Sequence, residues 1–474
     1  MMDRQNKYRT LLSNTFLISI GTFGSKLMTF LMVRFYTGIL TPSDYGTADL
    51  IMQTANLLLP VVSMGIANGV FRFALDQPRS RKSIFSGGVY TITAGSLLFV
   101  VIVSFLSMTS TFHGYAGLIA CYTLASCYHS LCAQFVRAEG KTALFAGQGI
   151  LNTALVIGLN ILFLVVFRLG IVGYVLSVAL ADGLCTVYLL LKERLWKLLI
   201  RHPRRGIIRK MLRYSIPLIP TTIFWWITSV SDRYMVTGFL GADANGLYAV
   251  AYKIPTILTL LSSIFLEAWQ FSAISEAEGS RKAHIRFYSQ IWSSFQAVMF
   301  LAGSVVIALS HLEIRLLTTE EYYTAWQYVP VLAVAMIFAA FASFTGSIYV
   351  VEKKSSLSFW TAMAGAVVNL LLNLLLIPTV GIQGAAIATL ASYLLSFGIR
   401  AISSRKLLPF RLYTGRLICN TLILTAQMIY AVCTFPMWPV VQVVCLLLLL
   451  ILNRKPIQAV ARKIRYLGKE KDVE

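Results

Sequence analysis

The chain has 474 residues, of which 57% are hydrophobic and 13% are charged. A soluble globular domain carries about 25% charged residues, so this composition excludes a water-soluble fold, which would leave too much apolar surface uncovered. The formal net charge of +22 would suggest nucleic acid as a partner in a soluble protein, but in a membrane protein Lys and Arg retained on the cytoplasmic side have a simpler role, which is to orient the helices.

Fourteen apolar segments reach the length of roughly 20 residues that a helix needs to cross a bilayer. They lie at about 11–36, 45–71, 83–109, 114–136, 142–167, 170–191, 214–240, 245–272, 286–310, 325–351, 355–378, 382–401, 413–434 and 437–453. The first follows MMDRQNKYRT without a small-residue cleavage site, so we expect it to be an uncleaved span. The fold class predicted is an all-α polytopic membrane protein with fourteen transmembrane helices.

The first six segments form the predicted N-terminal lobe, and three charged residues in it are candidates for function. Lys26 lies inside the first span and Arg34 at its outer end, while Asp182 is near the middle of the sixth. A charge inside a span is costly and by default suggests function. We predict Lys26 and Arg34 as substrate-binding residues. Asp182 has no charged neighbour in sequence and is predicted to be protonated, paired or an ion-coupling site.

A basic bridge, KERLWKLLIRHPRRGIIRKMLR at 192–213, separates the first six segments from the rest. It carries nine Lys and Arg and one acid, Glu193. Such a run alone would also fit a nucleic-acid patch or a solvated helix face. Because apolar spans flank it, we interpret it as a cytoplasmic loop at the membrane surface and expect no nucleic-acid partner.

The second lobe contains three further candidates. Arg233 lies at the outer end of the seventh span, beside Asp232, and either contributes to the outer mouth or sits among lipid headgroups. Lys253 lies inside the eighth span, where its side chain either faces the cleft or extends to the outer surface. Glu267 follows fourteen residues later, which in a continuous helix places it within about 40° of the same face. We predict Arg233 and Lys253 to bind substrate and Glu267 to take part in ion coupling.

The charges also predict the topology. With the N-terminus inside, 35 of the 41 Lys and Arg fall on the cytoplasmic side, four fall outside, and Lys26 and Lys253 lie within spans. A missed or invented helix would scramble this alternation. We therefore predict a multi-pass protein of the cell membrane with both termini in the cytoplasm.

A weak internal repeat relates the two lobes. TGIL at 37–40 corresponds to TGFL at 237–240, and Gly46 corresponds to Gly246. Because each lobe has an even number of helices, the lobes are parallel and are expected to enclose a central cleft. The predicted parts are an N-terminal lobe at 1–191, the basic linker at 192–213, a C-terminal lobe at 214–406, helices 13 and 14 at 407–453, and a basic cytoplasmic tail at 454–474.

No motif indicates catalysis. The chain lacks GxxxxGK[ST] and HExxH, and the predicted outer loops are short. The seven Cys lie in or beside apolar segments without metal-ligand spacing, so we expect small buried side chains and no disulfide. The chain is predicted not to be an enzyme and to need no metal or cofactor.

Three stretches resemble the polysaccharide-transporter branch, which includes O-antigen-type oligosaccharide flippases, of the multidrug/oligosaccharidyl-lipid/polysaccharide exporter superfamily. They are SKLMTFLMVRFYTGILTPSDYGTADL at 25–50, RAEGKT at 137–142 and VTGFLGADANGLYAVAYKIPTILTLL at 236–261. The resemblance implies a flippase that moves an undecaprenyl-diphosphate-linked oligosaccharide by alternating access through a cationic cleft. It also implies that helices 13 and 14 accept the polyprenyl chain, and that Lys26 and Lys253 match lysines of the family. The chain has no complete arginine cluster like that of lipid II flippases.

Two alternatives remain at this point. A cation or multidrug antiporter of the same superfamily should have an acidic cleft, whereas the acids Asp182 and Glu267 do not outnumber the buried lysines. A membrane enzyme or scaffold of glycan assembly is the other. The expected partners are the lipid-linked oligosaccharide, the bilayer, and a polysaccharide polymerase with its glycosyltransferases.

Overall fold

The computed structural model describes residue 24 and residues 27–76, 80–108, 114–276, 281–352 and 354–459, and all regular secondary structure in them is helical. The chain divides into two compact units, treated separately below. Unit 1 comprises residues up to Thr237 together with Gly241–Gly246, and unit 2 comprises Gly238–Leu240 and the residues from Leu247 onwards.

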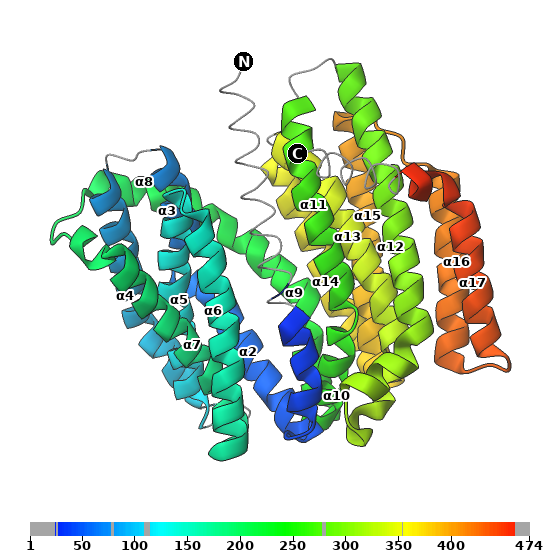
Figure 1. The fold of residues 1–474 in the computed structure, drawn as a ribbon, viewed down its shortest axis with the longest axis horizontal. Coiled ribbons are helices and arrows are strands. Elements are labelled where there is room, and N and C mark those ends of the chain that lie inside the picture. The colour runs from blue at the N-terminus through cyan, green and yellow to red at the C-terminus, as the bar shows by residue number, and fades with distance from the viewer. Residues whose placement is uncertain are drawn as a thin grey trace, which may run out of the picture. The chain divides into compact units, whose positions relative to one another are not determined.

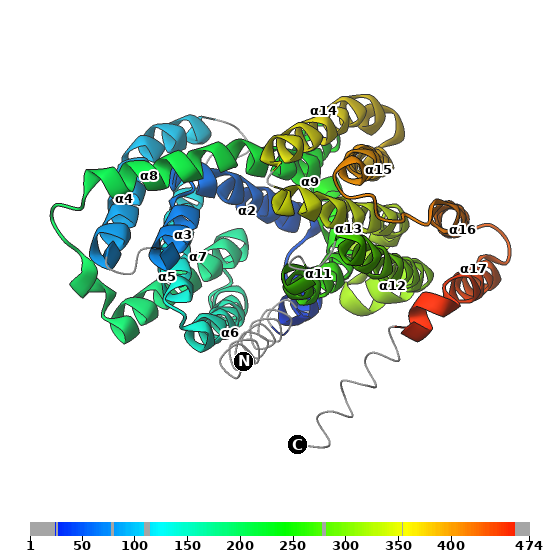
Figure 2. The same ribbon diagram turned by 90° about the horizontal axis from the view of Figure 1, so that it is seen from above.

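Unit 1 is a helical bundle arranged around α5. Besides a helix at Leu27–Thr37, its elements are α2 (Pro42–Val62), α3 (Ile66–Asp76), α4 (Arg81–Ser107), α5 (Ala116–Ala138), α6 (Thr142–Asn160), α7 (Gly170–Glu193), α8 (Arg205–Ser215) and most of α9 (Ile219–Leu240). Helix α5 packs against α2, α3, α4, α6 and α7, while α8 lies across α3 and α4 at one end of the bundle (Figures 1 and 2).

Helices α2 and α3 are two parts of one predicted span, 45–71. The Thr41 hydroxyl caps α2 by accepting a hydrogen bond from the Asp44 N–H at 3.2 Å. The helix ends at Val62, where Met64 and Gly65 adopt positive φ, and the axis bends by 50° into α3. The span is therefore broken where its sequence was expected to be continuous.

Unit 2 contains the remainder of α10 (Ala242–Lys253), then α11 (Thr256–Glu276), α12 (Arg281–Leu317), α13 (Val329–Val351), α14 (Ser355–Val380), α15 (Ile382–Leu407), α16 (Thr414–Cys433) and α17 (Trp438–Leu452). A central sheaf of α13, α14 and α15 is joined by Arg400 of α15, which is 3% exposed. Its guanidinium donates from Nε to Thr361 Oγ1 at 3.0 Å and from Nη1 to the carbonyl of Ala342 at 2.9 Å. Figure 1 shows α16 and α17 side by side at the end of the chain.

The helical membrane fold predicted from the sequence is confirmed. Within the described residues, ten helices are long and apolar enough to cross a membrane, or eleven when the bent pair α2 and α3 counts as one span. The number fourteen and the two-lobe arrangement stay predictions. The seven cysteines are all free thiols, but Cys121, Cys419 and Cys433 are exposed, so the expectation of burial is wrong for these three.

Candidate functional site

The predicted substrate-binding cations occupy different environments. Lys26 lies outside the described residues. Arg34 is exposed on the helix Leu27–Thr37. Lys253 is half-buried and is the last residue of α10.

Glu267 lies on α11, but not on one helix with Lys253. Helix α10 ends at Lys253, a turn follows at Ile254 and Pro255, and α11 begins at Thr256. Proline has no N–H to donate within a helix and its ring crowds the preceding turn. The expectation that Lys253 and Glu267 share a face, which assumed a continuous helix over 245–272, therefore loses its basis.

Arg233 is buried in an ion pair on α9. Its side chain is 4% exposed, and its Nη1 donates to both carboxylate oxygens of Asp49 on α2 at 2.5 Å. Gln53, one turn further along α2, reaches the same carboxylate at 3.5 Å. A guanidinium held in this way does not lie among lipid headgroups, so that interpretation of Arg233 is wrong. The structure instead assigns it to joining α2 and α9.

Asp49 was not among the predicted site residues, although a signal for it existed. It is an acidic residue inside the predicted span 45–71, so the argument that singled out Asp182 applies to it as well. A second contact reinforces the same junction, because the hydroxyls of Thr54 on α2 and Tyr234 on α9 are 2.7 Å apart.

The corresponding glycines of the internal repeat meet in unit 1. The Asn245 amide donates to the carbonyl of Gly46 at 2.8 Å. A Cβ added to Gly46 would lie 2.2 Å from the carbonyl oxygen of Ala242, and one added to Gly246 would lie 1.9 Å from that of Pro42. Both positions therefore need glycine for close backbone approach.

Asp182 of α7 is the centre of a buried polar cluster. The residue is 8% exposed, and its carboxylate accepts hydrogen bonds from the Ser126 hydroxyl and, at 2.8 Å, from the Asn152 amide. His129 Nδ1 lies 3.1 Å from Asp182 Oδ1. On its other side, His129 Nε2 lies 2.7 Å from Oε1 of Gln148. We call these five residues the Asp182 cluster; they come from α5, α6 and α7.

This arrangement is suited to holding a proton. A neutral imidazole donates through only one ring nitrogen, whereas both nitrogens of His129 face acceptor oxygens as the side chains are placed. The doubly protonated ring would satisfy both acceptors, and the Asp182 carboxylate would balance its charge. Of the alternatives predicted for Asp182, the structure shows that it is paired; its partners come from other helices and are distant in sequence.

The family follows from comparison with known proteins. Residues 11–278, more than half of the chain, match the family described as polysaccharide biosynthesis protein. The chain belongs to this family. An uncharacterized membrane protein of Methanocaldococcus jannaschii, MJ1375, is 26% identical over 260 residues, which cover 51% of this chain and 60% of that relative. The match thus spans less than two thirds of the relative's length.

Solved structures share the fold at low sequence identity. The lipid II flippase MurJ in an inward closed conformation has a TM-score of 0.68 at 15% identity, covering 95% of this chain and 99% of MurJ. An inward-facing MATE family multidrug transporter of the MOP superfamily has a TM-score of 0.57 at 14% identity, covering 81% and 94%. For the MATE transporter VcmN of Vibrio cholerae the values are 0.55 and 15%, covering 86% and 98%. The resemblance to this superfamily is confirmed.

Proposed function

We propose that this member of the polysaccharide biosynthesis family is a flippase, not an enzyme, and that it moves an undecaprenyl-diphosphate-linked oligosaccharide across the cell membrane. The observation that carries the proposal is that a chain of this family matches 99% of a lipid II flippase while 95% of its own length is covered. The two MATE transporters cover 81% and 86% of it, which makes a multidrug antiporter the weaker candidate.

Helices α16 and α17 support a lipid-linked cargo. Their outer surfaces expose apolar side chains, among them Leu422 at 64% and Val443 at 58%. Two buried amides join the helices, since Asn420 donates to Asn453 at 3.2 Å and receives a hydrogen bond from it at 2.9 Å. A stable apolar pair at the end of the chain would suit the polyprenyl tail.

The diphosphate of such a cargo needs cationic partners, because moving a compact anion into a low-dielectric region is costly. In this proposal, Lys26, Lys253 and Arg34 supply charge-assisted hydrogen bonds to the phosphate oxygens. We do not assign Arg233 to this task, since Asp49 already balances its charge. The Asp182 cluster is proposed to couple transport to proton movement, and Glu267 stays a second candidate for coupling.

Depletion of the protein tests the class of substrate. We expect surface polysaccharide to stop and its lipid-linked precursor to accumulate in the inner leaflet, measured by accessibility of the glycan to an impermeant periodate-coupled label on cells and on inverted vesicles. Normal polysaccharide together with raised sensitivity to cationic drugs would instead establish the antiporter.

Within this assay, alanine at Lys26 or Lys253 tests the cationic residues. Loss of a charge-assisted bond worth about 1.5–3 kcal/mol should weaken flipping roughly ten- to a hundredfold at matched expression. Arginine at either position should retain part of the activity because the anion needs positive charge. Unchanged flipping in the alanine variants would remove these two lysines from the mechanism while leaving the class of substrate standing.

A further inference from the structure

Helix α8 is a short amphipathic helix in the basic linker, and one of its faces is fixed to the bundle of unit 1. Met211 and Ser215 are fully buried. Glycines on the neighbouring helices allow the close packing, because a Cβ at Gly69 of α3 would lie 2.7 Å from Ser215 Oγ and one at Gly87 of α4 would lie 3.1 Å from Met211 Cε. The opposite face of α8 consequently points away from α3 and α4.

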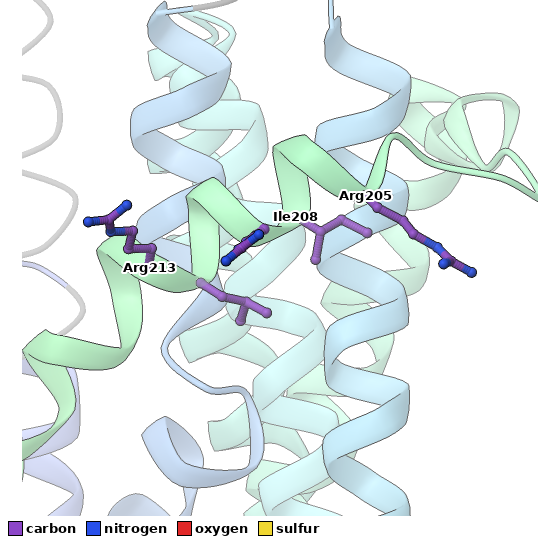
Figure 3. A pocket seen from close by; sticks show the side chains of 5 residues that line it. Arg205, Ile208 and Arg213 are labelled. Carbon is purple, nitrogen blue, oxygen red and sulfur yellow. The ribbon is translucent and has the colours of Figure 1, made fainter.

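That outer face carries a shallow open groove of about 530 Å³, lined by Arg205, Ile208, Arg209, Leu212 and Arg213. At about 100° per residue, the three arginines fall within an arc of about 80° and the two apolar side chains flank it on the side nearer the bundle. Figure 3 shows Arg205 and Arg213 at the two ends of the helix, with Ile208 between them along the axis. The groove therefore combines three guanidinium groups with an apolar edge.

The arginines are available for an external partner. Arg205, Arg209 and Arg213 are all exposed. Across the described parts of the chain, no ion pair or side-chain hydrogen bond engages their guanidinium groups, whereas Arg81 and Lys141 at neighbouring helix ends are paired with Glu139 and Glu193. The groove thus keeps three positive charges that the protein itself does not neutralise.

Apolar side chains flank the helix on both sides. Trp196 and Leu199 precede it and are 43% and 47% exposed, while Ile216 and Leu218 follow it and are 46% and 38% exposed. Exposed Trp and aliphatic side chains beside a row of cations are the pattern of a helix that lies in the membrane interface. A nucleic acid or an acidic peptide would leave this apolar surface in water, so neither suits the segment.

We propose that the α8 groove binds the headgroup of an anionic glycerophospholipid of the surrounding bilayer. The phosphodiester accepts hydrogen bonds from Arg205, Arg209 and Arg213, and the first acyl carbons lie along Ile208 and Leu212. This lipid is a resident of the membrane and not the cargo, so the proposal goes beyond the flippase function. It holds α8, and through it the ends of α3 and α4, at the membrane surface.

The test is lipid binding by the full-length purified protein, with phosphatidylglycerol and phosphatidylcholine titrated separately in detergent and bound lipid counted by native mass spectrometry. The groove variant is Arg205→Gln/Arg209→Gln/Arg213→Gln. Its matched control is Lys192→Gln/Lys197→Gln/Lys210→Gln, which removes the same charge from three exposed residues of the same linker that do not line the groove. Arg209→Gln alone serves if the triple variant does not elute as a folded species.

We expect the wild type to prefer phosphatidylglycerol, the groove variant to lose at least tenfold in affinity, and the control to lose much less, on the scale of about fivefold for each interfacial cation removed. Arg209→Gln should lose about fivefold on its own. Equal losses in the two triple variants would show general charge attraction and overturn the proposal, as would equal affinity for the two lipids. Displacement of the lipid by soluble pyrophosphate would make the groove a free-anion site and also overturn it. Because binding is measured without transport, none of these outcomes depends on the flippase proposal.

Discussion

Asp182 accepts hydrogen bonds from two helices, and at the scale of single residues this makes it the most informative position to change. Asp182→Asn keeps the size of the side chain and removes the charge that would balance a protonated His129. We expect the variant to insert and fold but to lose acceleration of flipping by an imposed proton gradient. Transport in proteoliposomes with and without that gradient measures the effect.

Two controls separate coupling from packing. Asn152→Leu removes a neutral donor to the same carboxylate and should lower stability while leaving the response to the proton gradient in place. His129→Gln should reproduce the loss of that response, because glutamine has the amide groups for hydrogen bonds but takes up no proton. A full response to the gradient in Asp182→Asn would contradict a coupling role for the cluster.

Sequence reasoning at this scale found the costly residues but not their partners. A charge in an apolar span is visible as such, which identified Asp182, Lys253 and Arg233. The partners depend on how each helix is rotated about its axis and on its depth relative to its neighbours. His129 and Asn152 are 53 and 30 residues from Asp182, and nothing in their local sequence specifies that they face it.

At the scale of helices, segment positions were predictable and their interruptions were not. Apolar length placed α4, α7 and α14 within a few residues of their observed bounds. The break between α2 and α3 at Met64 and Gly65 has no proline to mark it, since Pro60 lies inside α2. Helix α12 extends from Arg281 to Leu317, well beyond the predicted 286–310, because polar ends of a helix do not raise the hydropathy on which the prediction depends.

The junction of α2 and α9 yields a prediction at this scale. Removing one member of a buried ion pair leaves an uncompensated charge and costs about 3–5 kcal/mol. We therefore expect Asp49→Asn and Arg233→Gln each to lower thermal stability in detergent. The double variant should recover much of that loss, because no buried charge is left without its partner. Stabilities measured by thermal unfolding of all four proteins form the required cycle.

The matched control for this cycle is Thr54→Val with Tyr234→Phe, which removes the neutral hydroxyl contact between the same two helices. Its losses should be smaller, at about 1 kcal/mol. Strictly additive losses for Asp49→Asn and Arg233→Gln would mean that the pair does not join α2 to α9 in the membrane protein in solution.

At the scale of the whole molecule, the distribution of charge is the strongest argument that the sequence offers, because 35 of 41 cationic residues fall on one predicted side. A wrong helix count before any given loop would reverse the side of every later loop. The α10 and α11 break does not disturb this alternation, since residues 242–266 form one apolar span with a turn inside it. The orientation can therefore be tested at a few well-chosen loops.

Single cysteines in a background without the seven native ones provide that test. Lys354→Cys and Arg405→Cys lie in predicted cytoplasmic loops, and Asp243→Cys and Glu320→Cys lie in predicted outer loops; all four positions are exposed in the structure, so burial does not decide their reactivity. On intact cells a membrane-impermeant maleimide should label the two outer positions and spare the other two. After permeabilisation all four should react, which controls for access. Labelling of Arg405→Cys on intact cells together with protection of Asp243→Cys would invert the topology, and the α8 groove could then no longer lie on the cytoplasmic leaflet.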